Sequence, residues 1–174
     1  MRMLTATLFS AAMLLPAAAQ DEGASAVARM VTAQEQDAGT VTFRQTPSGM
    51  LHVTVEMTGL APGPHGFHVH EKGECDAAGG FESAGGHLAA GKDHGVDAQN
   101  GPHPGDFPNV HVGQDGVLKV EFYTDRLTIA EGDAALMDDD GSAVMLHEHA
   151  DDHASQPSGE AGGRIACGVV AQSS

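Results

Sequence analysis

The stretch "GFHVHEKGEC", residues 66–75, alternates apolar side chains with histidines before it enters an acidic turn and reaches a cysteine. Successive side chains of a β-strand point to opposite faces, so Phe67 and Val69 would face one way and His68 and His70 the other. The apolar pair can fill a core, which leaves two imidazoles on the outer face of a sheet, beneath any loop that covers it. Alone, this pattern is typical of surface histidines as well as of metal ligands.

Similar alternating and β-branched runs recur along the chain and are separated by turns rich in Gly, Pro and Asn, while few segments have helical periodicity. The expected strands cover residues 26–32, 40–45, 51–58, 66–70, 117–123, 143–149 and 164–170. This pattern predicts an all-β fold, a Greek-key β-sandwich or flattened barrel of about eight antiparallel strands.

Two segments lack the strand pattern. Residues 71–108 consist mostly of Gly, Asp, Ala and His, and residues 150–163 read "ADDHASQPSGEAGG". The first is far longer than ordinary connections, so it is expected to be either functional or disordered. We therefore expect two long loops, with function concentrated in them.

The N-terminus carries the features of an export signal. Arg2 precedes a short apolar run and the small residues Ala17 to Ala19, which together predict a signal peptide, residues 1–19, that is cleaved on secretion. Residues 20–174 would then form one domain in the periplasm, with 41% hydrophobic residues in the whole chain to build its core. Two cysteines in a secreted domain usually pair, so Cys75 and Cys167 are expected to form a disulfide.

The composition argues against several classes of partner. The formal net charge is −16, and loss of Arg2 with the signal would make it one unit more negative. Such a surface disfavours nucleic acid and anionic membranes. With one Tyr and no Trp, the chain also lacks stacking platforms for bases.

Further potential metal ligands follow the opening stretch: His87, His94, His103 and Asp106 in the first long loop, and His147 on a later strand. Three histidines and an aspartate form a tetrahedral zinc set. A set of nitrogens from His68, His70, His147 and one loop histidine suits Cu(II). One loop histidine must then serve both sets if each is to have four ligands.

These residues lie in blocks that resemble one family. "GFHVHEKGEC", "GGH", "KDHG", "GPHPGD", "LHEHADD" and "GGRIACGVV" occur in the order found in copper/zinc superoxide dismutases, and "GLAPGPHGFHVHEKGEC" is similar to the exported bacterial branch. The resemblance covers nearly all of residues 20–174. It implies an enzyme that converts superoxide to O2 and hydrogen peroxide, with one copper and one zinc per subunit.

The resemblance also assigns roles to individual residues. It implies that copper is bound by His68, His70, His87 and His147, and that zinc is bound by His87, His94, His103 and Asp106. His87 would bridge the two metals, take up a proton when copper is reduced and supply it to the peroxide product. Copper would carry the redox chemistry, because Zn(II) cannot cycle by one electron. Arg164 would attract the anionic substrate by a locally focused field, despite the negative net charge.

Two further matches are structural. Asp151 matches the carboxylate that links a copper histidine to a zinc histidine, and Cys75 and Cys167 match the family's disulfide. The chain departs from the family in lacking a proline near His87, in "HLAAG", and in a shorter interval between His87 and His94. The resemblance leaves five histidines without a role, and we expect them to be structural or surface residues: His52, His65, His111, His149 and His153.

An alternative from another class is an exported copper or zinc buffering protein that uses the same fold without turnover. The acidic surface and the extra histidines fit that alternative, but buffering alone would not require an arginine placed for an anion. A homodimer is compatible with the sequence, although no motif marks its interface.

Overall fold

The computed structural model describes residues 23–173, which form strands connected by loops and one short 3-10 helix. The strands in this range are β1 (Ser25–Thr32), β2 (Asp37–Gln45), β3 (Leu51–Met57), β4 (Gly63–His65), β5 (Phe67–His70), β6 (Val110–Val112), β7 (Leu118–Thr124), β8 (Ala143–His147) and β9 (Arg164–Gln172). The helix η1 spans Glu82–Ala84. The predicted all-β class is confirmed, and the predicted strands correspond to β1, β2, β3, β5, β7, β8 and β9. The predicted signal peptide, residues 1–19, lies outside the described residues.

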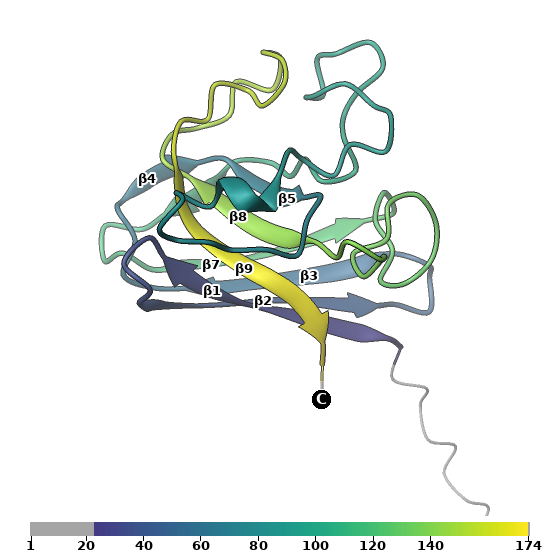
Figure 1. Ribbon diagram of the computed structural model, residues 1–174, viewed down its shortest axis with the longest axis horizontal. Helices are drawn as coiled ribbons and strands as arrows, with labels where there is room; N and C mark the ends of the chain where they lie inside the picture. Colours follow the sequence, from purple (N-terminus) through teal and green to yellow (C-terminus); the bar gives the residue numbers. More distant parts are fainter. Residues whose placement is uncertain (1–22, 174) are drawn as a thin grey trace, which may run out of the picture.

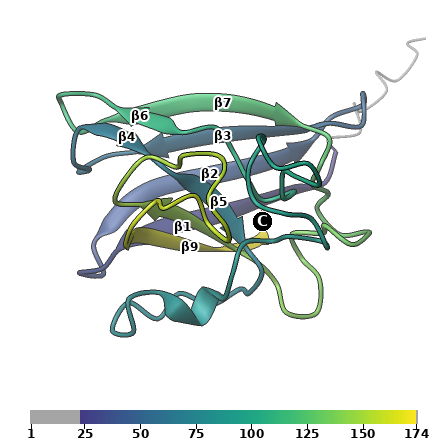
Figure 2. The ribbon, with the colours of Figure 1, turned by 90° about the horizontal axis from the view of Figure 1, so that it is seen from above.

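The strands form one curled antiparallel sheet and a small second one. The larger sheet has the order β5-β8-β9-β1-β2-β3-β7, and the smaller pairs β4 with β6. β4 and β5 follow each other in the chain but pair with different partners, so residues 63–70 link the β5 edge to the small sheet, which lies beside β7. Figure 2 shows β3, β4, β6 and β7 in one layer above β1 and β9 in the other. The result is a flattened barrel.

Strand alternation places the core between these layers. In β3, Leu51, Val53, Val55 and Met57 are buried while the residues between them are less so, as the period of two requires. Phe67 from β5 lies at the centre of the core, its ring centroid 5.6 Å from that of Phe107. The predicted inward direction of Phe67 and Val69 is confirmed, since both belong to this core.

The two predicted long loops connect β5 to β6, residues 71–109, and β8 to β9, residues 148–163. Figure 1 shows both loops on the same side of the barrel, over β5 and β8. A third long connection, residues 125–142 between β7 and β8, was not predicted. It buries Leu127, Ile129 and Leu136 in the core, so this connection adds to the packing of the barrel.

The predicted disulfide is present and joins Cys75 in the first long loop to Cys167 in β9, 92 positions later. Phe81 and Ala84, from the loop segment that contains η1, pack with the fully buried Cys167 in a second small core. The loop is therefore held against β9 by a covalent bond and by apolar packing. Among residues 23–173, no helix is long and apolar enough to cross a membrane.

Candidate metal centre

Four buried histidines converge beside β5. His68 and His70 lie on β5, His147 ends β8, and His87 comes from the first long loop. One ring nitrogen of each lies within 4.8 Å of the corresponding nitrogen of every other member. The loop reaches this position because His87 forms an isolated bridge with His70, and Leu88 N–H donates to the Val69 carbonyl at 2.8 Å. The histidines predicted on the outer face of the strand are thus covered by the loop and buried.

The inward nitrogens of these histidines have no hydrogen-bond partner among the described residues: His68 Nδ1, His70 Nε2, His87 Nε2 and His147 Nε2. An unpaired buried polar atom is costly, so four such atoms that face one another are suited to binding one common ligand. The opposite nitrogens are all paired with oxygen atoms: Asp151 for His68, the Gly85 carbonyl for His70, Asp106 for His87 and the Gly162 carbonyl for His147. For His68, His70 and His147 this is the usual arrangement of metal-binding histidines, whose second nitrogen donates to an oxygen. The residues therefore fit a bound metal ion.

Burial also keeps these histidines in the neutral form that binds a metal. It lowers the pKa of His87 to about 4 and that of His147 to about 3. It also lowers the pKa of His70 well below its usual range. Each ring therefore has a free lone pair at neutral pH.

A second group of potential metal ligands shares His87 with the first group. The Nδ1 atoms of His87, His94 and His103 lie 2.9, 3.1 and 3.2 Å from a single oxygen, Oδ1 of Asp106. The other oxygen of Asp106 accepts backbone N–H groups from Gly95 at 2.9 Å and His103 at 3.0 Å. Burial raises the pKa of Asp106, but hydrogen bonds from His103, His87 and Gly95 outweigh this and lower it overall. Three imidazoles and an ionised carboxylate form the donor set of a tetrahedral zinc site.

The two groups are linked in two ways. His87 belongs to both, since Nε2 faces the four-histidine group and Nδ1 faces Asp106. Asp151 joins them from the other side, with Oδ2 2.7 Å from His68 Nε2 and Oδ1 3.0 Å from His94 Nε2. Its carboxylate is fully buried and therefore holds both rings in fixed orientations.

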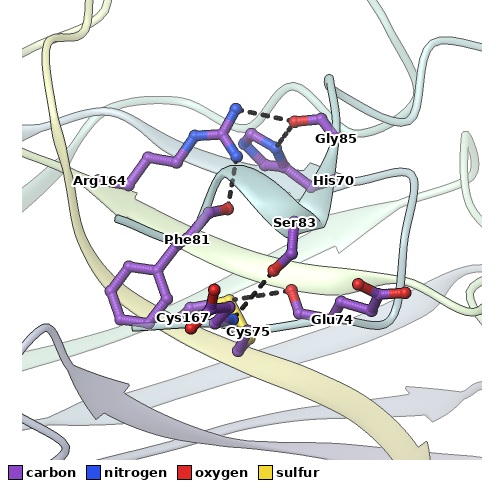
Figure 3. Close-up of a disulfide and its surroundings, with 9 residues drawn as sticks. His70, Glu74, Cys75, Phe81, Ser83, Gly85, Arg164 and Cys167 are labelled. Atoms are coloured by element: carbon purple, nitrogen blue, oxygen red, sulfur yellow. Dashed lines mark hydrogen bonds between the residues drawn. A yellow bond between two sulfur atoms is a disulfide. The ribbon is translucent and has the colours of Figure 1, made fainter. Parts of the chain in front are cut away.

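Arg164, the first residue of β9, lies at the edge of the four-histidine group. Its Nη1 donates to the Phe81 carbonyl at 2.7 Å, and its Nη2 donates to the Gly85 carbonyl at 2.8 Å (Figure 3). The Gly85 carbonyl also accepts from His70, so the guanidinium and a histidine of the group share one anchor. Arg164, His70, His87 and His147 line one cavity of about 260 Å³, together with Pro157 and Ser158. The carboxylate of Glu82 also lines this cavity, 3.6 Å from Arg164 Nη2, but it is 76% exposed and therefore screened by solvent. The mostly buried guanidinium is thus placed to attract a small anion.

The other five histidines belong to neither group of potential ligands. His52 stacks on Tyr123 with ring centroids 4.9 Å apart, and the side chains of His111 and His149 are exposed. His65 is buried between two backbone carbonyls, and His153 contacts Asn109. None of them joins either group.

Sequence reasoning missed several groups that hold the site together. The Gly85 and Gly162 carbonyls orient His70 and His147. Asn109 exchanges two hydrogen bonds of 2.8 Å with the backbone of Asp151. These contacts join residues 15 to 42 positions apart, and neither a glycine carbonyl nor a single asparagine gives a sequence signal for such a role.

The lowered histidine pKa values predict how the metal-free protein responds to acid. Each such ring is neutral when folded, whereas the unfolded chain takes up protons below pH 6.5. As the pH is lowered from 6.5 towards the lowered pKa of a histidine, the free energy of unfolding should therefore fall by about 1.4 kcal/mol per pH unit for that histidine. Urea unfolding at pH 7 and pH 5 measures this, and equal stability at both would contradict it.

Comparisons with known proteins agree with this geometry. The family model described as copper/zinc superoxide dismutase matches residues 37–170. The Cu-Zn superoxide dismutase of Caulobacter vibrioides is 41% identical over 84% of this chain and 85% of its own length. The Cu-Zn superoxide dismutase 2 of Aquifex aeolicus is 35% identical over 94% of this chain and 96% of its own.

Solved structures show the same likeness. The crystal structure of a superoxide dismutase-like protein from Bacillus subtilis superposes with a TM-score of 0.78 at 35% identity, covering 82% of this chain and 96% of that one. The shared fold, the family match over most of the described residues and the relatives in several bacteria lead to one conclusion. The chain belongs to the copper/zinc superoxide dismutase family, whose enzymes use copper and zinc.

Proposed function

We propose that this protein is an active superoxide dismutase that binds one copper and one zinc. The observation that carries the proposal is the set of four unpaired inward nitrogens on His68, His70, His87 and His147, beside a fixed Arg164. One relative is named only superoxide dismutase-like, so family membership alone does not establish turnover. In this chain both donor sets and the arginine are present together, which supports the catalytic function.

The two donor sets divide the metals by their chemistry. The all-nitrogen set of His68, His70, His87 and His147 suits copper, and the set that contains Asp106 suits zinc. When bound, copper would supply one-electron redox chemistry, and zinc would supply a fixed positive charge and hold the loop. The chain's own contribution is to present neutral imidazoles at the positions the metals require.

Three residues have tasks beyond metal binding. Arg164 binds and orients the superoxide anion in the cavity, because its guanidinium carries a permanent charge and offers N–H donors to an oxyanion. His87 lines the same cavity, and its Nε2 has no hydrogen-bond partner among residues 23–173, so this atom could hold a proton when it is not bound to copper. Asp151 keeps the rings of His68 and His94 in their orientations.

The cellular setting is also part of the proposal. We infer that residues 1–19 are removed on export and that residues 20–174 work in the periplasm, where a disulfide such as Cys75–Cys167 persists. The proposed centre does not require the homodimer that the sequence allows, because every residue of both donor sets comes from one chain.

A chelator experiment separates dismutation from metal buffering. Purified residues 20–174, loaded with copper and zinc, should accelerate superoxide decay, and a copper-specific chelator should abolish the acceleration. Serum albumin loaded with equal copper serves as a control for loosely bound metal. Stoichiometric copper and zinc without accelerated decay would support the buffering alternative and overturn the proposal.

A further inference from the structure

Gln156, in the loop between β8 and β9, binds the backbone of His94. The His94 N–H donates to Gln156 Oε1 at 2.9 Å, and Gln156 Nε2 donates to the His94 carbonyl at 2.8 Å. One planar side-chain amide thus pairs with both backbone polar groups of a single residue, as a neighbouring strand would. His94 lies outside the strands, so no sheet ladder fixes its backbone.

Gln156 holds the backbone of a residue whose buried ring is itself held by two further contacts. His94 is fully buried, with Nδ1 3.1 Å from Asp106 and Nε2 3.0 Å from Asp151. Both ring contacts depend on the direction of its Cα–Cβ bond, and the backbone sets that direction. By fixing the peptide planes on either side of His94, Gln156 fixes where Nδ1 points.

The two loops also meet next to this contact. Asp97 N–H donates to the His153 carbonyl at 3.2 Å. Gly95, at φ 87°, lies so close to the same carbonyl that a Cβ at this position would collide with it. The segment from His94 to Asp97 is therefore docked along residues 153–156.

The residues that follow Gln156 face the other half of the site. Pro157 and Ser158 line the cavity that also contains His70, His147 and Arg164. Because Gln156 directly precedes these two residues, a displacement of its backbone would be passed to the wall of this cavity. The side-chain amide connects a ligand of the proposed zinc site to the space where the anion would enter.

We propose that Gln156 is a positioning residue that fixes His94 for zinc binding and couples the zinc site to the wall of the anion cavity. The proposal rests on the proposed function for the identity of the metal, and it concerns positioning and not turnover. Residues of this kind, which orient a metal ligand, typically change metal affinity by 10- to 100-fold when they are replaced.

Zinc release tests the first half of the proposal. Copper-free, zinc-loaded Gln156→Ala should release zinc to a colorimetric chelator at least about 10-fold faster than the wild type. Gln156→Glu preserves the size of the side chain and can accept from His94 N–H, but it cannot donate to the His94 carbonyl, so faster release is expected there too. Gln114→Ala and Gln114→Glu, in an exposed turn, are the matched controls and should match the wild type.

Two measurements distinguish positioning from general destabilisation. Thermal unfolding of the metal-free variants should match that of the wild type. Co²⁺ bound in the zinc site should show a shifted visible spectrum in both Gln156 variants and in neither Gln114 variant. Labelling by phenylglyoxal tests the coupling: the modification rate of Arg164 should rise several-fold in Gln156→Ala, with Arg44 in the same digest as the internal standard.

Each outcome decides the proposal. Wild-type zinc release from both Gln156 variants would overturn it, and so would faster release with an unchanged Co²⁺ spectrum or an unchanged labelling rate of Arg164. A wild-type protein that binds no zinc would overturn this proposal and the proposed metal centre together. A wild-type protein that binds zinc but does not dismutate superoxide would overturn only the proposed function, because none of these readouts requires turnover.

Discussion

Replacement of His147 by alanine is expected to slow superoxide decay by more than about 100-fold and to abolish stoichiometric copper binding. His147 supplies one of the four unpaired inward nitrogens, and no other histidine among the described residues lies close enough to substitute for it. Loss of a residue that merely orients a metal ligand costs 10- to 100-fold in affinity, so loss of a ligand should cost more. Copper content by atomic absorption and superoxide decay by stopped flow measure the two effects.

His149→Ala is the matched control for this variant. His149 lies two residues further along the same segment, but its side chain is 64% exposed and belongs to neither donor set. We expect wild-type copper content and wild-type rates for His149→Ala. Normal copper binding and activity in His147→Ala would show that the four-histidine group is not the copper site.

Replacement of Arg164 by alanine should lower the second-order rate constant by about 10-fold or more at low ionic strength, with copper and zinc content unchanged. The chain has a formal net charge of −16, so without this cation its overall field would repel an anion. Local focusing of positive charge raises association rates by about 10- to 1000-fold, and salt screens it. The rate of the wild type should therefore fall with added salt more steeply than that of Arg164→Ala.

The control for Arg164→Ala is Arg44→Ala on the exposed side of β2, which removes the same charge away from the cavity. Its rate constant should stay close to that of the wild type. If both variants slowed equally, net charge alone would explain the effect. Wild-type rates in Arg164→Ala would contradict the role of this residue in attracting the anion.

The strands and the placement of the first two histidines were predictable because they depend on local patterns. A period of two fixes the faces of Phe67, His68, Val69 and His70, and β5 has the predicted arrangement. The three-residue strands β4 and β6 were missed, since a run so short has no detectable period. The apolar residues of the third long connection, such as Leu127, lack strand alternation, and their pattern did not indicate that they are buried in the core.

The residues of the two histidine groups were predictable as a set, but the contacts that orient them were not. His94, His103 and Asp106 stood out because they lie in the sequence blocks that resemble the family, and the structure brings them together with His87. The contacts that orient them arise from tertiary folding. Gln156 meets His94 across 62 positions, and Arg164 meets Phe81 across 83, so only the folded chain reveals these partners.

The central claim is that the four-histidine group holds a redox-active copper that dismutates superoxide. The most direct test is to add Cu²⁺ in steps to the metal-free protein preloaded with zinc and to measure the rate of superoxide decay at each step. The account predicts a rate that rises in proportion to bound copper and reaches a plateau at one copper per chain. A rate that stays at the uncatalysed level while copper binds stoichiometrically would contradict it.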